Sequence, residues 1–99
     1  MPVYLLGQLQ VKNWGWYKQY QEVTEALVKK HDGRYLVKSA QVDQLEGGST
    51  PPSAVVVIEF PSVEHAQQWY QDPDYQPMIE LRKISDVDTE LLLVSGVSS

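Results

Sequence analysis

Glu59 is the residue of this sequence whose type and position point most directly to chemistry. It interrupts the run from Ala54 to Phe60, in which every other residue is apolar. Burying a carboxylate is costly unless it is paired or neutralised, and a desolvated carboxyl group is a usable general acid or base. The alternative is structural: Glu59 ends the strand and is held by Arg34 or by backbone amides of the turn at Pro61. The sequence leaves both interpretations open.

His31 is the second candidate for proton transfer. Histidine titrates near neutral pH, so it can exchange a proton or bind an anionic ligand. It also follows Lys29 and Lys30 in the last turn of an expected helix, where positive charge is favourable without any catalytic role. The chain has two histidines and no cysteine, and the histidines lack metal-ligand spacing. We therefore expect no metal site and no bound cofactor.

Arginines and aromatic side chains supply the candidates for ligand binding. Arg34 and Arg82 can each orient a carboxylate through paired hydrogen bonds, or each can form an ion pair within the chain. Aromatic side chains such as Trp69 suit a flat, partly apolar ligand, but at helical spacing they are also typical of a core. The residues that we expect to contact a ligand are Arg34, Tyr35, Trp69, Tyr75 and Arg82.

The first half of the chain has the pattern of strand, helix and strand. Residues 3–11 show the alternation of apolar side chains that is typical of a strand. Apolar residues then recur at helical spacing over residues 16–28, with Asn13 as the expected N-cap and Gly33 as the stop. Residues 35–45 are rich in apolar and β-branched types and predict a second strand.

The second half repeats this order. Residues 54–60 predict a strand covered on both faces, and Ser62 is placed to cap the helix that follows. A further helical segment is expected over residues 76–84 and a last strand over residues 89–97. Two such halves predict an α+β fold of the ferredoxin-like, split βαβ type, in which a four-stranded antiparallel sheet carries its helices on one face.

Apolar residues on both faces of the third strand predict a homodimer. Val55 and Val57 lie on one side and Val56 and Ile58 on the other, and Tyr4 and Leu6 of the first strand add to the second face. Two helices can cover only one face of such a sheet, so a monomer would expose an apolar patch. Pairing two sheets face to face removes that patch. The alternative is a face that is only moderately apolar and is tolerated in water.

Five short motifs occur in the order and spacing of one bacterial family; they are His31-Asp32-Gly33-Arg34-Tyr35-Leu36-Val37, Leu45-Glu46-Gly47, Val57-Ile58-Glu59-Phe60-Pro61-Ser62, Trp69-Tyr70 and Pro73-Asp74-Tyr75. From about residue 3 to residue 95 the chain resembles the family called domain of unknown function thirteen-thirty, in the dimeric α+β barrel superfamily. The resemblance implies two sheets that form a barrel across a dimer, with a pocket near the helices and the barrel interior. It implies no reaction.

The wider superfamily includes cofactor-independent monooxygenases, lactone isomerases, haem enzymes and stress proteins, but transfer from these rests on the fold alone. We therefore expect a protein that binds a small aromatic or carboxylate-bearing metabolite in a pocket. Whether it is a cofactor-independent enzyme or a non-catalytic, stress-associated dimer stays open. The enzymatic interpretation requires Glu59 and His31 to converge within reach of one water in a single pocket.

Size and charge exclude other classes of function. A chain of 99 residues is expected to form one domain, residues 1–99, with an ordered core over about residues 3–97. A net charge of −5 argues against binding to nucleic acid, because the phosphate backbone is recognised by positive charge. No apolar run has membrane-spanning length. We expect a cytoplasmic protein with no membrane contact.

Overall fold

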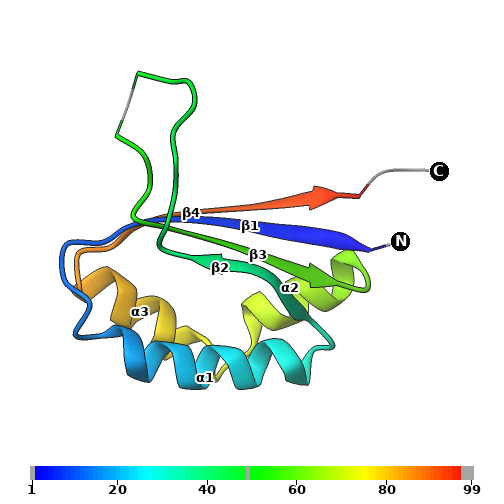
Figure 1. Ribbon diagram of the computed structural model, residues 1–99. Helices are drawn as coiled ribbons and strands as arrows, with labels where there is room; N and C mark the ends of the chain where they lie inside the picture. The colour runs from blue at the N-terminus through cyan, green and yellow to red at the C-terminus, as the bar shows by residue number, and fades with distance from the viewer. Residues whose placement is uncertain (1, 49, 97–99) are drawn as a thin grey trace.

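The secondary structure of the computed structural model follows the predicted order, including the further helix expected over residues 76–84 (Figure 1). The structure describes residues 2–48 and 50–96. The elements, in chain order, are β1 (Val3–Gln10), α1 (Tyr17–Lys30), β2 (Arg34–Ser39), β3 (Ala54–Phe60), α2 (Val63–Gln71), α3 (Gln76–Ile84) and β4 (Asp88–Ser95).

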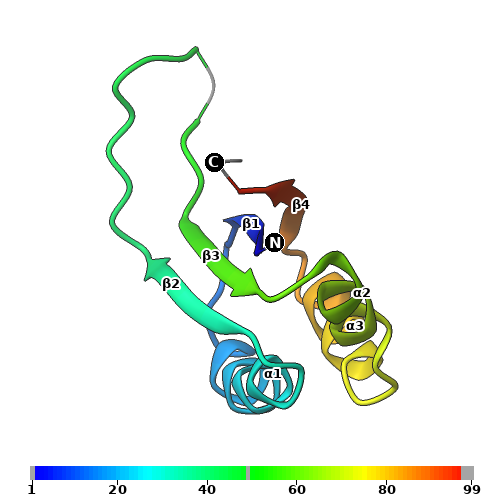
Figure 2. The same ribbon diagram turned by 90° about the vertical axis from the view of Figure 1, so that its right-hand side faces the viewer.

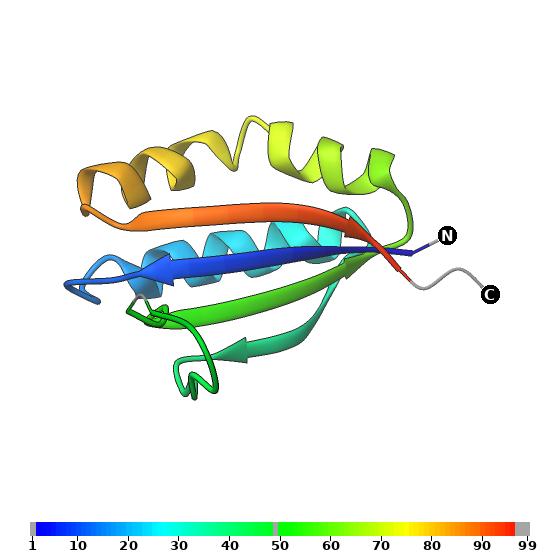
Figure 3. The ribbon, with the colours of Figure 1, turned by 90° about the horizontal axis from the view of Figure 1, so that it is seen from above.

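The four strands form one antiparallel sheet in the order β2-β3-β1-β4, which is the ferredoxin-like order that the repeat predicts. All three helices lie on one face of this sheet, as two views at right angles show (Figures 1 and 2). From above, α1 runs beneath the sheet while α2 and α3 follow each other along the β4 edge (Figure 3). None of the described helices is both long enough and apolar enough to cross a membrane.

Alternation along β1 and β3 decides which side chains meet the helices. Leu5 pairs with Ile58 of β3, and both are buried between the sheet and the helices. Leu6 pairs with Val57 on the opposite side, which we call the open face. The first strand therefore adds its even-numbered residues to the face of Val55 and Val57, not to the face of Val56 and Ile58 as the sequence analysis placed them. The apolar residues of the open face are Tyr4, Leu6, Val37, Val55, Val57, Leu92 and Val94.

The start of α1 differs from the prediction. The helix begins at Tyr17, after Trp16, which makes no side-chain capping bond. Asn13, the predicted cap, instead accepts a hydrogen bond at its Oδ1 from the backbone N–H of Gly15 at 2.7 Å. This local turn carries the chain through Trp14, whose carbonyl accepts from the N–H of Tyr17 at 3.0 Å. An asparagine side chain that closes its own turn is no longer free to cap a helix.

The second strand is shorter than predicted. β2 ends at Ser39, which pairs with Val55 near the first residue of β3. Pairing cannot continue beyond this point because Pro51 and Pro52 precede β3, and proline has no N–H for a strand ladder. Residues 40–48 and 50–53 therefore leave the sheet and stand out from it on the side away from the helices (Figures 1 and 2). We call this segment the arm.

The remaining helices agree with the prediction. Ser62 caps α2, accepting from the N–H of His65 at 3.2 Å. α3 covers residues 76–84, with Pro77 tolerated in its first turn. β4 ends at Ser95, and Val97, the predicted end, lies outside the described residues. The largest fully buried side chains of the core are Trp69, Tyr75, Phe60 and Val28.

Candidate functional site

Two adjoining hollows lie along β4, between this strand and the helices α2 and α3. They have volumes of about 310 Å³ and 230 Å³ and share Tyr70 and Leu91. Small-molecule pockets typically measure roughly 300–1,000 Å³. The first is lined by Tyr70, Ile79, Arg82, Lys83, Val87, Thr89 and Leu91, and the second by Leu5, Ala66, Gln67, Trp69, Tyr70, Gln71, Leu91 and Leu93. We call the pair the β4 groove.

A smaller, mostly apolar cavity of about 40 Å³ lies deeper, between the sheet and α1. Trp69, Tyr75, Tyr20 and Tyr35 line it, and Trp69 and Leu91 border both this cavity and the groove. It is larger than the roughly 10–15 Å³ that one water needs, and far smaller than an aromatic metabolite. The groove is therefore the space that is large enough for a ligand. The residues that line the small cavity form the inner wall of the groove.

Arg82 is the buried charged residue of this site, which Lys83 also lines. It lies on α3 with only 5 % of its surface exposed. Its guanidinium Cζ is 5.8 Å from the ring centroid of Tyr20 and 6.0 Å from that of Tyr75. Its Nη2 donates to the Tyr75 hydroxyl at 3.4 Å, and this hydroxyl lies 3.1 Å from the Tyr20 hydroxyl. No ion pair is found for Arg82 among the described residues.

Three residues that line the groove each carry a buried hydrogen-bond donor without a partner in the part of the chain that the structure describes. These donors are Nε of Arg82, Nε1 of Trp69 and Oγ1 of Thr89. Buried polar atoms nearly always have partners, so each exception calls for an explanation. Indole and guanidinium nitrogens can only donate. A ligand that offers hydrogen-bond acceptors would satisfy them, and a carboxylate offers acceptors together with the charge that Arg82 lacks.

The hydroxyls of Tyr75 and Tyr35, at the inner wall, remain neutral. Burial raises the pKa of Tyr75 above its ordinary value, and the neighbouring Tyr20 raises it further. Burial likewise raises the pKa of Tyr35. These groups can therefore donate or accept hydrogen bonds at physiological pH, but they do not ionise to become bases.

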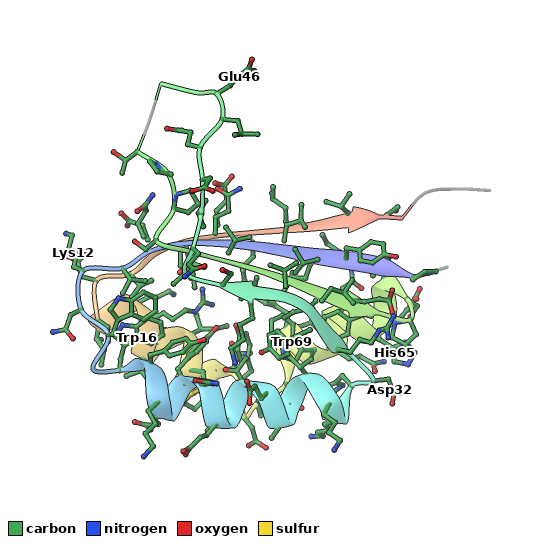
Figure 4. All side chains as sticks on the ribbon, viewed as in Figure 1. Lys12, Trp16, Asp32, Glu46, His65 and Trp69 are labelled. Carbon is green, nitrogen blue, oxygen red and sulfur yellow. The ribbon has the colours of Figure 1, made fainter. Side chains whose placement is uncertain are left out.

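Trp69 and Tyr75 form the centre of an aromatic cluster beneath the sheet. Their ring centroids are 4.5 Å apart, and Trp69 also lies 5.6 Å from Phe60. Figure 4 shows Trp69 between the sheet and the helix layer, toward the α2 side of the molecule. Both residues belong to the core, and both also line the inner cavity.

The proton-transfer candidates lie elsewhere. Glu59 projects from the open face, where its Oε1 accepts from Nε of Arg34 at 2.9 Å. His31, at the end of α1 on the helix side, donates from Nε2 to Oδ2 of Asp72 at 2.8 Å. The same oxygen accepts from Lys30 at 2.9 Å. Glu59 and His31 are thus on opposite sides of the sheet, and each has a partner that accounts for its position.

The structure therefore separates the two arginines. Arg34 forms the ion pair that the sequence analysis offered as one alternative, and its side chain is 71 % exposed. Arg82 forms no ion pair among the described residues and lines a groove that Tyr70 and Trp69 also line. Of the five predicted ligand contacts, Trp69 and Arg82 line the groove, Tyr35 and Tyr75 lie at its inner wall, and Arg34 lies on the other face of the sheet.

Sequence reasoning did not select Tyr20 or Thr24 as site residues. Both face the inner cavity from α1, together with Tyr17. Their spacing of three and four residues, in a helix with a polar opposite side, is the signal that could have found them. Lys38, whose direction the sequence left open, faces α1 and forms an ion pair with Glu25.

The fold is that of several solved structures. The protein of unknown function RPA0582 from Rhodopseudomonas palustris is 16 % identical, with a TM-score of 0.79 over 99 % of this chain and 84 % of that one. SnoaB, a cofactor-independent oxygenase from Streptomyces nogalater, is 11 % identical, with a TM-score of 0.68 over 99 % and 95 % of the two chains. A de novo designed protein, Foldit4, is also 11 % identical, with a TM-score of 0.64 over 98 % and 100 %.

Likeness at such identities concerns the backbone, as the designed protein illustrates, and it defines the class: a ferredoxin-like α+β protein with the chain fold of the dimeric α+β barrel oxygenases. Within this class, the chain belongs to the family described as Domain of unknown function (DUF1330), whose profile matches residues 2–97. No curated protein matches this sequence.

Proposed function

We propose that this protein binds a small aromatic carboxylate in the β4 groove, with Arg82 holding the carboxylate. The observation that carries the proposal is a buried arginine that has no acidic partner among the described residues. A buried guanidinium without a counter-charge is costly, and a carboxylate from outside the chain would supply that charge.

The groove suits the rest of such a ligand. Leu91 and Tyr70 border both of its hollows, and Trp69 closes it toward the core. Apolar and aromatic walls with a few polar groups are typical of small-molecule sites. The unpaired Nε1 of Trp69 and Oγ1 of Thr89 offer donors for further oxygen atoms on the ligand.

Binding is better supported than acid–base catalysis. Among the residues that the structure describes, no Asp, Glu or His lines the groove or the inner cavity. The neighbouring tyrosines are held neutral by burial. SnoaB acts without a cofactor, which keeps a cofactor-independent reaction as the second candidate. In that case the proton would be exchanged by the ligand itself or by water.

We also propose that the working form is a homodimer paired through the open face. The seven apolar residues of this face form a continuous patch across all four strands. Its centre is Leu6, which pairs with Val57 on one side and Leu92 on the other. A patch of this kind is typical of an interface between copies.

Ligand binding is tested with benzoate and with benzamide, its neutral analogue, followed by tryptophan fluorescence and calorimetry. We expect the wild-type protein to prefer benzoate and Arg82→Gln to weaken that binding at least tenfold, because a charge-assisted hydrogen bond is lost. Arg34→Gln removes the same charge from the other face and should bind benzoate like the wild type. Arg82→Lys, which keeps the charge, should retain part of the affinity.

Equal binding of benzoate and benzamide, or equal losses in Arg82→Gln and Arg34→Gln, would contradict the proposal.

The dimer is tested by sedimentation velocity at micromolar concentration. We expect a dimer mass for the wild type and a monomer mass for Leu6→Asp, because a buried carboxylate at the centre of the patch has no partner. A monomer mass for the wild type would contradict the dimer.

A further inference from the structure

The arm is unusually long for the connection between two neighbouring antiparallel strands. It spans residues 40–53, whereas hairpin loops usually contain roughly 2–5 residues. It rises from the open face of the sheet, on the side away from all three helices (Figures 1 and 2). Any molecule that covers the open face therefore also meets the arm.

The base of the arm is held to the body of the protein. Nε2 of Gln10 donates to the carbonyl of Pro51 at 3.0 Å. The N–H of Ser53 donates to the carbonyl of Leu9 at 2.8 Å, and its hydroxyl accepts from the N–H of Val11 at 3.0 Å. The direction in which the arm leaves the sheet is therefore fixed by hydrogen bonds to the residues of the arm that lead into β3.

The outer end of the arm has no such support. Leu45 is 93 % exposed, more than any of the other large apolar side chains that the structure describes. Glu46 beside it marks the outer end of the arm in Figure 4, far from the sheet. A large apolar side chain on a projecting segment gains nothing within its own chain, and burial against another molecule would stabilise it.

Charge indicates which molecule this is. The arm contains two acidic residues, Asp43 and Glu46, and no lysine or arginine. Among the described strand residues, Arg34 is the one Arg or Lys on the open face, and it lies at the end of β2 opposite the arm. Its Nε binds Glu59, while most of its side chain is exposed.

In a face-to-face pair of sheets, a two-fold axis can lie between the sheets and perpendicular to the strands. Such an axis places the arm of each copy over the end of the other sheet that is opposite that sheet's own arm. An isologous pair of this kind satisfies both arms at once and closes the assembly. The acidic arm then meets the end of the open face that carries Arg34, whose side chain is mostly exposed beside its bond to Glu59.

We propose that the arm clasps a second copy of this chain, with Leu45 packed on the partner's sheet and the arm's acidic residues facing the partner's Arg34. This inference rests on the homodimer proposed above and adds its orientation and its anchor. One copy alone cannot form this contact, because Arg34 and the arm of the same chain lie at opposite ends of β2.

The anchor is tested with Leu45→Asp and a matched control, Ile84→Asp. Ile84 is 80 % exposed at the end of α3, on the helix side of the molecule. We expect Leu45→Asp to raise the dimer dissociation constant at least tenfold in sedimentation equilibrium, as for the loss of one buried leucine. Ile84→Asp should leave it unchanged.

The orientation is tested by crosslinking, for which the chain is well suited because it has no cysteine. Leu45→Cys, labelled with a benzophenone maleimide, should crosslink on irradiation to a dimer in which the label joins the partner's peptide that contains Arg34. Ile84→Cys with the same label should give no crosslinked dimer.

The outcomes separate the two proposals. A wild-type monomer would overturn the homodimer and the clasp together. A dimer that Leu45→Asp weakens no more than Ile84→Asp would overturn the clasp alone. So would a crosslink from position 45 to the helix side of the partner.

Discussion

Arg82 lies two helical turns after Tyr75, and its guanidinium turns back to donate to the Tyr75 hydroxyl at 3.4 Å. This is the one hydrogen bond to a protein atom found for the guanidinium among the described residues. A neutral phenol cannot compensate the charge of a buried guanidinium as a carboxylate does. Arg82 is therefore not part of an ion pair with Tyr75. It is a cation held in place by the two aromatic rings of Tyr20 and Tyr75.

Arg82→Met should raise the free energy of unfolding by about 1 kcal/mol, because it removes a buried charge without a counter-ion and keeps a long apolar stem. Urea unfolding of the ligand-free protein at neutral pH measures the change. A loss of more than about 1 kcal/mol would show that the two cation–π contacts outweigh desolvation. Arg82 would then be a structural residue.

Glu59→Gln should change the free energy of unfolding by less than about 1 kcal/mol, because Arg34, its partner, is 71 % exposed and can be solvated by water. A double-mutant cycle with Arg34→Gln should give a coupling below the same limit. Coupling of about 3 kcal/mol, the size typical of a buried pair, would contradict this assignment.

Asp72→Asn should lower the melting temperature at pH 7. Hydrogen bonds from His31, from the backbone of Asp74 and from Lys30 hold the pKa of Asp72 well below its ordinary value. A carboxyl group whose pKa is lower in the folded state stabilises the fold above its unfolded pKa, of about 3.9. That stabilisation is lost as the pH falls through the folded pKa.

The difference in melting temperature between the wild type and Asp72→Asn should therefore shrink as the pH falls below about pH 4. Thermal scans followed by circular dichroism from pH 7 to pH 2 measure it. Glu22→Gln, at an exposed position of α1, should match the wild type throughout. A difference that grows as the pH falls from 4 to 2 would have the wrong sign for the lowered pKa of Asp72.

Gly33→Ala should lower the free energy of unfolding by about 1–3 kcal/mol, the usual cost of overpacking a core. A Cβ at this position would stand 2.7 Å from Cε1 of Phe60 and 2.9 Å from Cγ1 of Val28, both of them buried. Gly48→Ala, where nothing lies within 4 Å, is the matched control and should have no such cost. Chemical denaturation of both variants side by side checks the prediction.

The order of the elements and the type of fold could be predicted from sequence because they depend on local patterns. Alternation along residues 3–10 fixes which side of β1 meets the helices, since successive side chains of a strand point to opposite faces. Ser62 caps α2 by a hydrogen bond to a residue three positions away. Interactions of such short range are visible in the residue order itself.

Local patterns were insufficient where a competing interaction came from a distance. Residues 40–45 have strand-like composition, but strand pairing needs a partner, and Pro51 and Pro52 remove it. Asn13 has the right type for a cap, yet its side chain closes the turn at Gly15.

The candidate site shows the same division. The sequence determined that two arginines, a few carboxyl groups and a set of aromatic residues were available to do chemistry. The tertiary structure alone decided that Arg34 meets Glu59 in water while Arg82 is buried between Tyr20 and Tyr75, which are 55 positions apart. Burial and the absence of a counter-charge depend on packing between distant segments, and residue type does not report them.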